Sequence, residues 1–144
     1  VTESVFGVDL VKLQLHLAAG NKVPRSQATI ASYGHAIECR INAEDQNFVP
    51  SPGTISRLHL PGGAGVRIDS HLYEGYKVPY HYDSLVAKLI TIGAERSEAV
   101  SRMANALDEV EVRGISTNVD LLKKILADES FVVGQYTTSL LDTY

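Results

Sequence analysis

The chain has 144 residues, 44% of them hydrophobic, which is enough to bury a substantial core in one domain, 1–144. A net charge of −4 without a run of Lys and Arg argues against nucleic acid or an anionic membrane as a partner, and no apolar stretch is long enough to span a bilayer. The single cysteine, Cys39, cannot form an internal disulfide, so we expect a reducing, cytoplasmic location and an apolar role for this side chain.

The first residues have no initiator methionine and no signal-like character, so we expect a piece of a longer polypeptide. An amphipathic pattern follows and predicts a helix over residues 5–19. Its apolar residues form two stripes at helical spacing, which predicts a wide buried face that packs against more than one neighbour. Gly20 and Asn21 are suited to end this helix, because both tolerate the left-handed cap.

Residues 34–45 alternate in polarity and predict a strand. One face carries four polar side chains, namely Glu38, Arg40, Asn42 and Glu44. The guanidinium of Arg40 therefore has a carboxylate two residues before it and an amide two residues after it. Such neighbours hold the planar fork at a chosen angle, which suits an oxyanion, a carboxylate or a phosphate. The alternative is a half-exposed strand whose polar face meets only water.

The middle of the chain predicts short strands separated by turns. Strands are expected over 54–60 and 66–70, and Pro- and Gly-containing turns over 50–53 and 61–65. Residues 85–92 are almost continuously apolar, which predicts a central strand buried on both faces. Strands joined in this way favour an antiparallel sheet.

Two helices are expected to follow the sheet, which makes the predicted fold class α+β. Ser97 is suited to cap the first, which should end near Gly114. Its apolar stripe consists of Val100, Met103, Leu107 and Val110. Thr117 and Asp120 resemble a capping box at the start of the second. The tail 131–144 is expected to contain a final short helix.

Other candidate sites are weaker. The five histidines show no metal-ligand spacing, so we expect no metal site, and the Gly-rich segment 61–65 lacks the Lys-Ser/Thr of a phosphate-binding loop. Asp83 lies where residues 80–84 lead into the buried strand, and polar residues there often line a site. The alternative is that Asp83 anchors backbone amides in a turn. Lys88 is a further candidate, because an ammonium within an apolar strand is costly unless it is paired or at an edge.

The sequence Gly34-His35-Ala36-Ile37-Glu38-Cys39-Arg40-Ile41-Asn42-Ala43-Glu44-Asp45 resembles the signature of the biotin carboxylase C-terminal domain in the ATP-grasp family. The order of later segments agrees: Pro50-Ser51-Pro52-Gly53, Pro61-Gly62-Gly63, Val66-Arg67, Tyr82-Asp83-Ser84, Lys88-Leu89-Ile90 and Thr117-Asn118-Val119-Asp120-Leu121. The resemblance spans essentially the whole chain and is strongest to the free-standing subunit of bacterial acetyl-CoA carboxylase.

The resemblance implies a ligase that uses ATP, Mg²⁺ and bicarbonate to carboxylate biotin on a carrier protein. Arg40 would be the catalytic and substrate-binding residue, beside bicarbonate and the biotin ureido oxygen. Glu38, Asp83 and Thr138 would line the site, with the segment around Thr138 bordering the adenine. Arg67 matches a residue of the family's homodimer interface, where a bacterial relative has a bulky aromatic in place of Ala64.

The same resemblance implies partner proteins, and it implies that the chain contains only part of the active site. The expected partners are the biotin carboxyl carrier protein, a carboxyltransferase and a second copy of the chain, in fatty acid biosynthesis. The family's nucleotide-binding, magnesium-binding and remaining catalytic residues would precede this sequence, so the isolated chain is expected to bind no cofactor and to be inactive. Gln46 stands where the family usually has Pro, and the following loop is one residue short.

Two alternatives stay open. The chain is compatible with the equivalent domain of a pyruvate, propionyl-CoA or methylcrotonyl-CoA carboxylase. A non-catalytic alternative is a folding and dimerisation module in which Arg40 has only a structural role.

Overall fold

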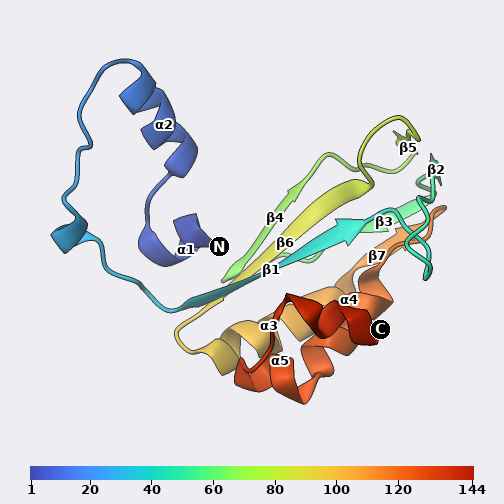
Figure 1. The fold of residues 1–144 in the computed structure, drawn as a ribbon. Coiled ribbons are helices and arrows are strands. Elements are labelled where there is room, and N and C mark those ends of the chain that lie inside the picture. The colour runs from blue at the N-terminus through green and yellow to red at the C-terminus, as the bar shows by residue number, and fades with distance from the viewer.

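The computed structural model describes residues 1–144, and an antiparallel sheet of three strands lies at its centre (Figure 1). The strands are β1 (His35–Asn42), β6 (Leu85–Gly93) and β4 (Val66–Ser70), in the order β1-β6-β4. The central strand β6 is buried along most of its length, because it pairs on both edges and its residues are apolar on both faces. The predicted central strand and the α+β class are confirmed.

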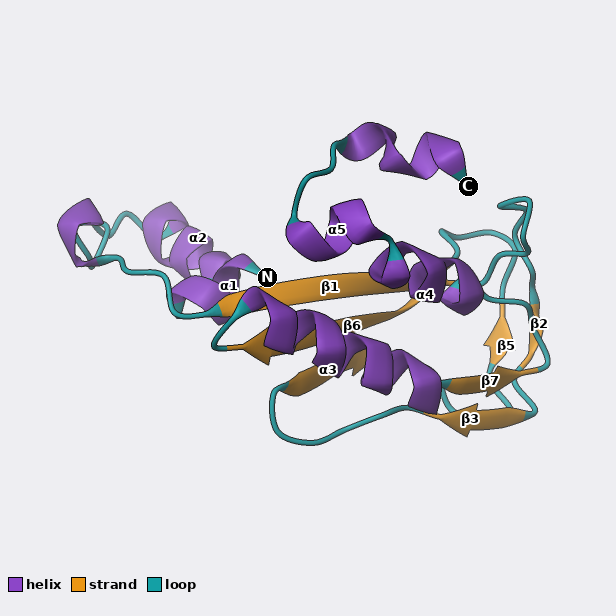
Figure 2. Ribbon diagram, turned by 90° about the horizontal axis from the view of Figure 1, so that it is seen from below, coloured by secondary structure: helices purple, strands orange, loops and turns teal.

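Two small antiparallel sheets extend one end of the central sheet. In one of them β2 (Gly53–Thr54) pairs with β5 (Lys77–Val78). In the other β3 (Arg57–His59) pairs with β7 (Glu111–Arg113). Figure 2 shows both pairs beyond the end of β1 and β6, on the side away from the N-terminal helices.

The prediction of a single strand over 54–60 is wrong, because the two halves of this segment pair with different strands. The buried Ile55 donates its N–H to the carbonyl of Tyr76, whereas the N–H of Ser56 binds the carbonyl of Arg113. Each half of the segment therefore joins a different strand. Alternation within the segment does not reveal such an exchange.

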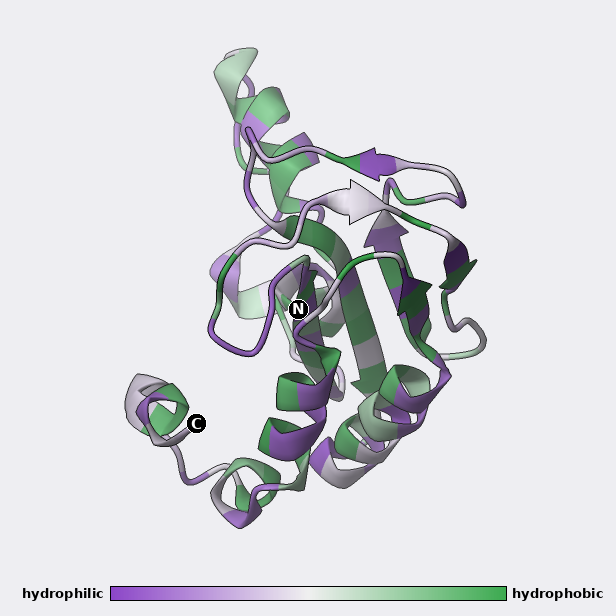
Figure 3. Ribbon diagram, turned by 90° about the vertical axis from the view of Figure 1, so that its right-hand side faces the viewer, coloured by the Kyte–Doolittle hydropathy of each residue, from purple (hydrophilic) through white to green (hydrophobic).

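Two helices, α3 (Arg96–Glu109) and α4 (Val119–Ala127), cover one face of the central sheet, and α5 (Glu129–Val133) packs against α4 (Figure 2). From α3 the buried side chains are Ala99, Val100, Met103, Ala106 and Leu107. They pack against the inward side chains of β1 and β6 in a single hydrophobic core. Figure 3 shows hydrophobic and hydrophilic residues alternating around these helices, as expected where one side faces a sheet.

The ends of α3 differ from those predicted. The helix begins after Glu95 rather than Ser97, and it ends at Glu109 because the next residues extend and pair as β7. Gly114 therefore ends β7, not the helix. It has a φ of 100°, and a Cβ there would collide with the carbonyl of Thr54.

The C-terminal elements correct one prediction and bear out another. Residue 118, not Thr117, precedes α4, and the predicted capping box with Asp120 is not formed. The tail 131–144 contains the end of α5 and, as predicted, a final short helix, the 3₁₀ helix η2 (Thr138–Thr143). Gly134, with a φ of 78°, separates them.

The single helix predicted over 5–19 is wrong. Gly7 adopts a φ of 61° and divides the segment into α1 (Thr2–Phe6) and α2 (Leu10–Ala18). Asp9 then starts α2 by accepting a hydrogen bond from the N–H of Lys12 at 2.9 Å.

The predicted wide buried face is likewise absent within the chain, since α1 and α2 contain no buried residue. Val11 and Leu15 are 66% and 68% exposed. After α2 a short 3₁₀ helix, η1 (Gln27–Thr29), leads back to β1. No helix in the structure has both the length and the apolar character needed to cross a membrane.

Candidate functional site

Strand β1 presents its polar residues on the face of the sheet opposite to α3. Cys39 and Ile41 point into the core, while Arg40 between them is exposed. The predicted alternation is confirmed. The guanidinium of Arg40 takes no part in any ion pair or hydrogen bond within the chain, so a full positive charge stands free on this face.

The backbone on both sides of the Arg40 side chain is held by Asn118. The Asn118 Nδ2 donates to the carbonyl of Arg40 at 3.1 Å, and its Oδ1 accepts from the N–H of Asn42 at 2.9 Å. One amide thus satisfies two backbone groups of β1 on the edge that β6 does not pair. This contact joins residues 78 positions apart, so the sequence, which showed Asn118 only as part of a family segment, could not reveal that it binds β1.

A second polar group lies just beyond Arg40. Glu44 accepts hydrogen bonds from the hydroxyl of Ser84 and, at 3.2 Å, from the Nδ2 of Asn42. The Oδ1 of Asn42 is buried without a hydrogen-bond partner. Sequence reasoning placed Asn42 and Glu44 on the correct face but did not predict their link to Ser84, which depends on the β1–β6 pairing.

Lys88 lies directly across from Arg40 in the neighbouring strand. The register pairs Arg40 with Lys88 and Lys88 in turn with Asp69 of β4. The Nζ of Lys88 lies 3.6 Å from the Oδ2 of Asp69, so this half-buried ammonium has the partner that its apolar strand requires.

Asp69 is bound more closely by Arg67 than by Lys88. The Nε and Nη2 of Arg67 donate to its two carboxylate oxygens at 3.0 and 3.1 Å, in the bidentate geometry typical of such pairs. This arrangement lowers the pKa of Asp69 and raises that of Arg67. Arg67 also contacts Glu3 of α1 at 3.3 Å, which ties the N-terminal helix to the polar face.

Cys39 has the apolar role predicted for it. The side chain is buried, and this burial, together with the charge of Glu38, raises the pKa of the thiol to about 12. The thiol is therefore protonated and unreactive at neutral pH.

The other residues predicted to line the site occupy different places. Glu38 is half-buried, two residues before Arg40 on the same face. Asp83 is exposed and accepts a hydrogen bond from the N–H of Leu85 at 2.8 Å, which is the turn-anchoring role considered as the alternative. Thr138 begins η2 in the C-terminal tail, which lies beside α4 and α5 in Figure 1.

The two residues predicted for a dimer interface lie at one edge of the sheet. Arg67 is exposed on the edge strand β4, and Ala64 is exposed in the turn that precedes this strand. The N–H of Ile92 donates to the carbonyl of Gly65, which fixes that turn against β6.

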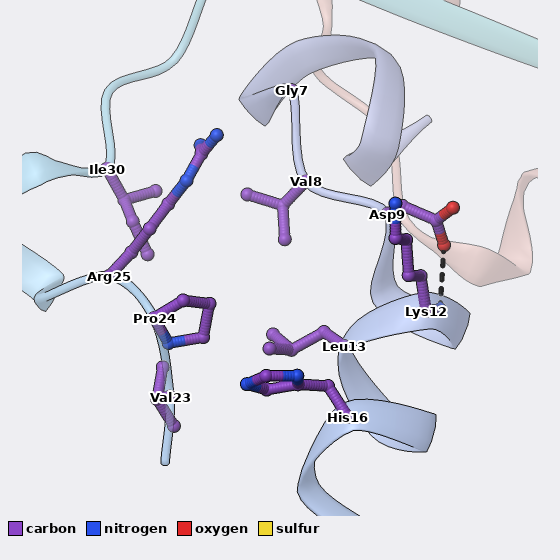
Figure 4. A pocket seen from close by; sticks show the side chains of 10 residues that line it. All are labelled: Gly7, Val8, Asp9, Lys12, Leu13, His16, Val23, Pro24, Arg25 and Ile30. Carbon is purple, nitrogen blue, oxygen red and sulfur yellow. Dashed lines mark hydrogen bonds between the residues drawn. The ribbon is translucent and has the colours of Figure 1, made fainter. Parts of the chain in front are cut away.

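The N-terminal segment contains a separate hollow of about 400 Å³, drawn in Figure 4. It lies between α2 and the segment that returns to β1, with His16 and Leu13 on one side and Pro24 and Arg25 on the other. Arg40 does not line it. The structure holds no group of three or more His, Cys, Asp or Glu side chains suited to bind a metal ion.

Comparison with known proteins identifies the domain. The family model of the biotin carboxylase C-terminal domain matches residues 38–143, a range that contains Arg40, Lys88 and Asn118. The chain belongs to this family. The family resemblance inferred from the Arg40 strand is thereby confirmed.

Individual relatives agree with this assignment. The chain is 56% identical over 135 residues to biotin carboxylase of Pseudomonas aeruginosa, covering 93% of the chain and 30% of the relative. It is 44% identical to a pyruvate carboxylase subunit of Methanothermobacter thermautotrophicus, covering 100% of the chain and 30% of that protein. The chain thus spans about a third of the length of the relatives it matches.

A solved structure has the same fold. The biotin carboxylase domain dimer of Hydrogenobacter thermophilus 2-oxoglutarate carboxylase, in complex with MgADP, ADP and bicarbonate, superposes with a TM-score of 0.94 at 45% identity. The match covers 99% of this chain and 32% of that one. The fold described above is therefore shared with a relative along nearly the whole chain.

Proposed function

We propose that this chain is the C-terminal domain of an ATP-dependent biotin carboxylase, which carboxylates biotin on a carrier protein with bicarbonate. The observation that carries the proposal is Arg40, an exposed guanidinium without an acidic partner. The strand that carries it is fixed by β6 on one edge and by Asn118 on the other. A cation fixed in this way, with no partner inside the chain, is suited to bind an anion.

Arg40 would act on the reacting biotin. Removal of the ureido proton leaves negative charge on the ureido oxygen, and the guanidinium supplies a fixed positive charge beside it. A preorganised donor at a developing oxyanion contributes about 3–4 kcal/mol to transition-state stabilisation. Because β1 is held on both edges, little reorganisation is required when the charge develops.

ATP and magnesium would be held mostly by the rest of the polypeptide. No carboxylate cluster of this chain is suited to Mg²⁺, so we assign it no metal step. We propose that Thr138 borders the adenine and that Glu38 and Asp83 line the biotin side of the site. A hollow beside η2, lined by Thr137 and Ser139, lies next to Thr138 and is compatible with this placement.

Substitution of Arg40 by Ala in the full-length carboxylase tests the proposed role. We expect a folded protein whose biotin carboxylation falls by about 10²–10³-fold, the loss typical for removal of an oxyanion donor. Arg113→Ala is a matched control, since Arg113 is an exposed arginine of β7, outside the β1-β6-β4 sheet, and pairs only with Glu111. Normal specific activity of R40A with reduced thermal stability would instead favour the non-catalytic folding module.

We further propose acetyl-CoA carboxylase, in cytoplasmic fatty acid synthesis, as the complex that contains this chain. The higher identity to a biotin carboxylase, 56%, than to a pyruvate carboxylase subunit, 44%, supports this choice. Pyruvate, propionyl-CoA and methylcrotonyl-CoA carboxylases are the alternatives. Carboxyl transfer from the purified complex to each acceptor in turn distinguishes them, and transfer to pyruvate alone would contradict our choice.

The proposed partners follow from the same assignment. They are the biotin carboxyl carrier protein, a carboxyltransferase and a second copy of the chain. The solved relative is described as a dimer, and Arg67 and Ala64 lie exposed at an edge of the sheet where a second copy would contact them. The molar mass of the full-length carboxylase in solution tests the dimer.

A further inference from the structure

We infer that Lys88 is a second cation of the Arg40 site and helps Arg40 to bind a small oxyanion, for which bicarbonate is the natural candidate. This inference rests on the proposed function. Lys88 is not part of the sequence motif around Arg40. It is also not needed to bind ATP or Mg²⁺ in the full-length carboxylase.

The register places the two cations side by side. Arg40 and Lys88 are direct partners across β1 and β6 and lie on the same face of the sheet. Directly opposed side chains in an antiparallel pair have Cβ atoms about 4.5–5.5 Å apart. Two cationic side chains that start from neighbouring Cβ atoms repel each other, and an anion bound between their charged ends converts the repulsion into two attractions.

The position of Lys88 on the strand is well fixed. It stands in the central strand between Val86 and Ile90, which are 2% and 4% exposed. These neighbours restrict the aliphatic stem, so the ammonium is held near the face instead of extending freely into solvent.

The ion pair with Asp69 leaves the Lys88 ammonium able to bind a further acceptor. Both oxygens of Asp69 already accept hydrogen bonds from Arg67 at 3.0 and 3.1 Å, whereas the Lys88 Nζ is 3.6 Å away. Asp69 therefore orients the ammonium loosely and leaves its donors available to another acceptor. The lysine also lines a hollow of about 230 Å³, so protein atoms do not enclose it.

The surroundings indicate the class of ligand. Arg40 offers a planar fork that can bind two oxygens of a carboxylate-like group, and Lys88 offers a point charge for a third oxygen. Glu38 lies diagonally from Lys88, and Asp69 lies beyond it. These carboxylates reduce the local positive potential, which favours a small, singly charged oxyanion over a polyphosphate.

The test uses the full-length carboxylase with bicarbonate as the probe. In Lys88→Gln we expect the KM for bicarbonate in ATP cleavage to rise about tenfold while kcat changes little, because one partly exposed charge near the anion is lost. Lys88→Arg should restore the KM, since it keeps the charge. Lys77→Gln, an exposed lysine on β5 remote from Arg40 in the sheet order, should behave as wild type.

The outcomes separate this inference from the proposed function. If the wild-type protein shows no bicarbonate-dependent ATP cleavage, the proposed function fails. If wild type is active and K88Q has an unchanged KM for bicarbonate, only the role of Lys88 is overturned. Lys88→Met, which keeps the apolar stem, replaces K88Q if the Gln variant unfolds early, and an unchanged KM there overturns the inference equally.

Discussion

Two arginines on the same face of one sheet have opposite surroundings. Arg67 is bound by Asp69 and Glu3, and its charge is therefore balanced within the chain. Arg40 has no such partner, although Glu38 lies on the same strand and Glu44 just beyond its end. Glu44 is already engaged by Ser84 and Asn42, which leaves the Arg40 charge free for a ligand.

Asn118 makes the position of Arg40 depend on a side chain outside the sheet. Substitution Asn118→Ala removes two hydrogen bonds to the β1 backbone and leaves both groups without this partner. We expect a loss of about 1–3 kcal/mol in unfolding free energy and a clear fall in kcat for biotin carboxylation. Chemical denaturation and steady-state kinetics of the full-length protein measure both quantities.

The matched variant for this prediction is Asn118→Asp. It keeps the oxygen that accepts from the N–H of Asn42 but loses the donor to the carbonyl of Arg40. An intermediate effect on stability and activity is expected. If Asn118→Ala keeps full activity, the position of Arg40 does not depend on Asn118.

Among the helices and strands, the sequence predicted correctly those whose structure depends on their own apolar pattern. It failed for those whose structure depends on a single backbone angle or on a distant partner. The strands β1 and β6 were predicted correctly, because their alternation and continuous apolar run arise from burial by the sheet itself. The helix over 5–19 and the strand over 54–60 were not. A left-handed Gly7 and a change of partner at Ile55 decided those segments, and neither alters the apolar pattern.

In the candidate site, too, the sequence predicted the local features but not the long-range ones. The shared face of Glu38, Arg40 and Asn42 followed from period-two alternation, and the role of Arg40 was available only through family resemblance. Lys88 was noted as unusual in its strand, but its position opposite Arg40 depends on a register that the sequence does not specify.

Gly114, the glycine in the connection from β7 to α4, should be sensitive to substitution. Its φ of 100° is unfavourable for other residues, and a Cβ would collide with the carbonyl of Thr54 in β2. We expect Gly114→Ala to lower the unfolding free energy by about 2–4 kcal/mol. Urea denaturation measures the change.

Gly62→Ala is the control for this prediction. A Cβ added at Gly62 would meet no atom within 4 Å, and this glycine does not have a positive φ. Its substitution should change the unfolding free energy by less than about 0.5 kcal/mol. Equal effects of the two substitutions would contradict the steric argument.

For the whole molecule, the exposed apolar side chains of α2 are the main departure from an ordinary domain surface. Val11, Leu15 and Leu17 are 66%, 68% and 41% exposed. The chain spans about 30% of the Pseudomonas aeruginosa relative, so under the proposed function the remaining polypeptide would cover this helix.

The isolated chain provides a prediction at this scale. It contains Arg40 but no carboxylate cluster for Mg²⁺, so we expect no bicarbonate-dependent ATP cleavage when it is purified alone. Release of phosphate from ATP, measured with and without bicarbonate and biotin, checks this expectation. Appreciable turnover would show that the chain carries a nucleotide site of its own.

The long-range contact of Asn118 also has a consequence for synthesis. Residue 40 leaves the ribosome well before residue 118, and β6, which pairs with β1, also follows it by about fifty positions. Translation proceeds at roughly 5–20 residues per second, so β1 is synthesised several seconds before the residues that bind its two edges. During that interval β1 is an unpaired strand with apolar residues on one face, and such a strand is exposed to mispairing with other chains.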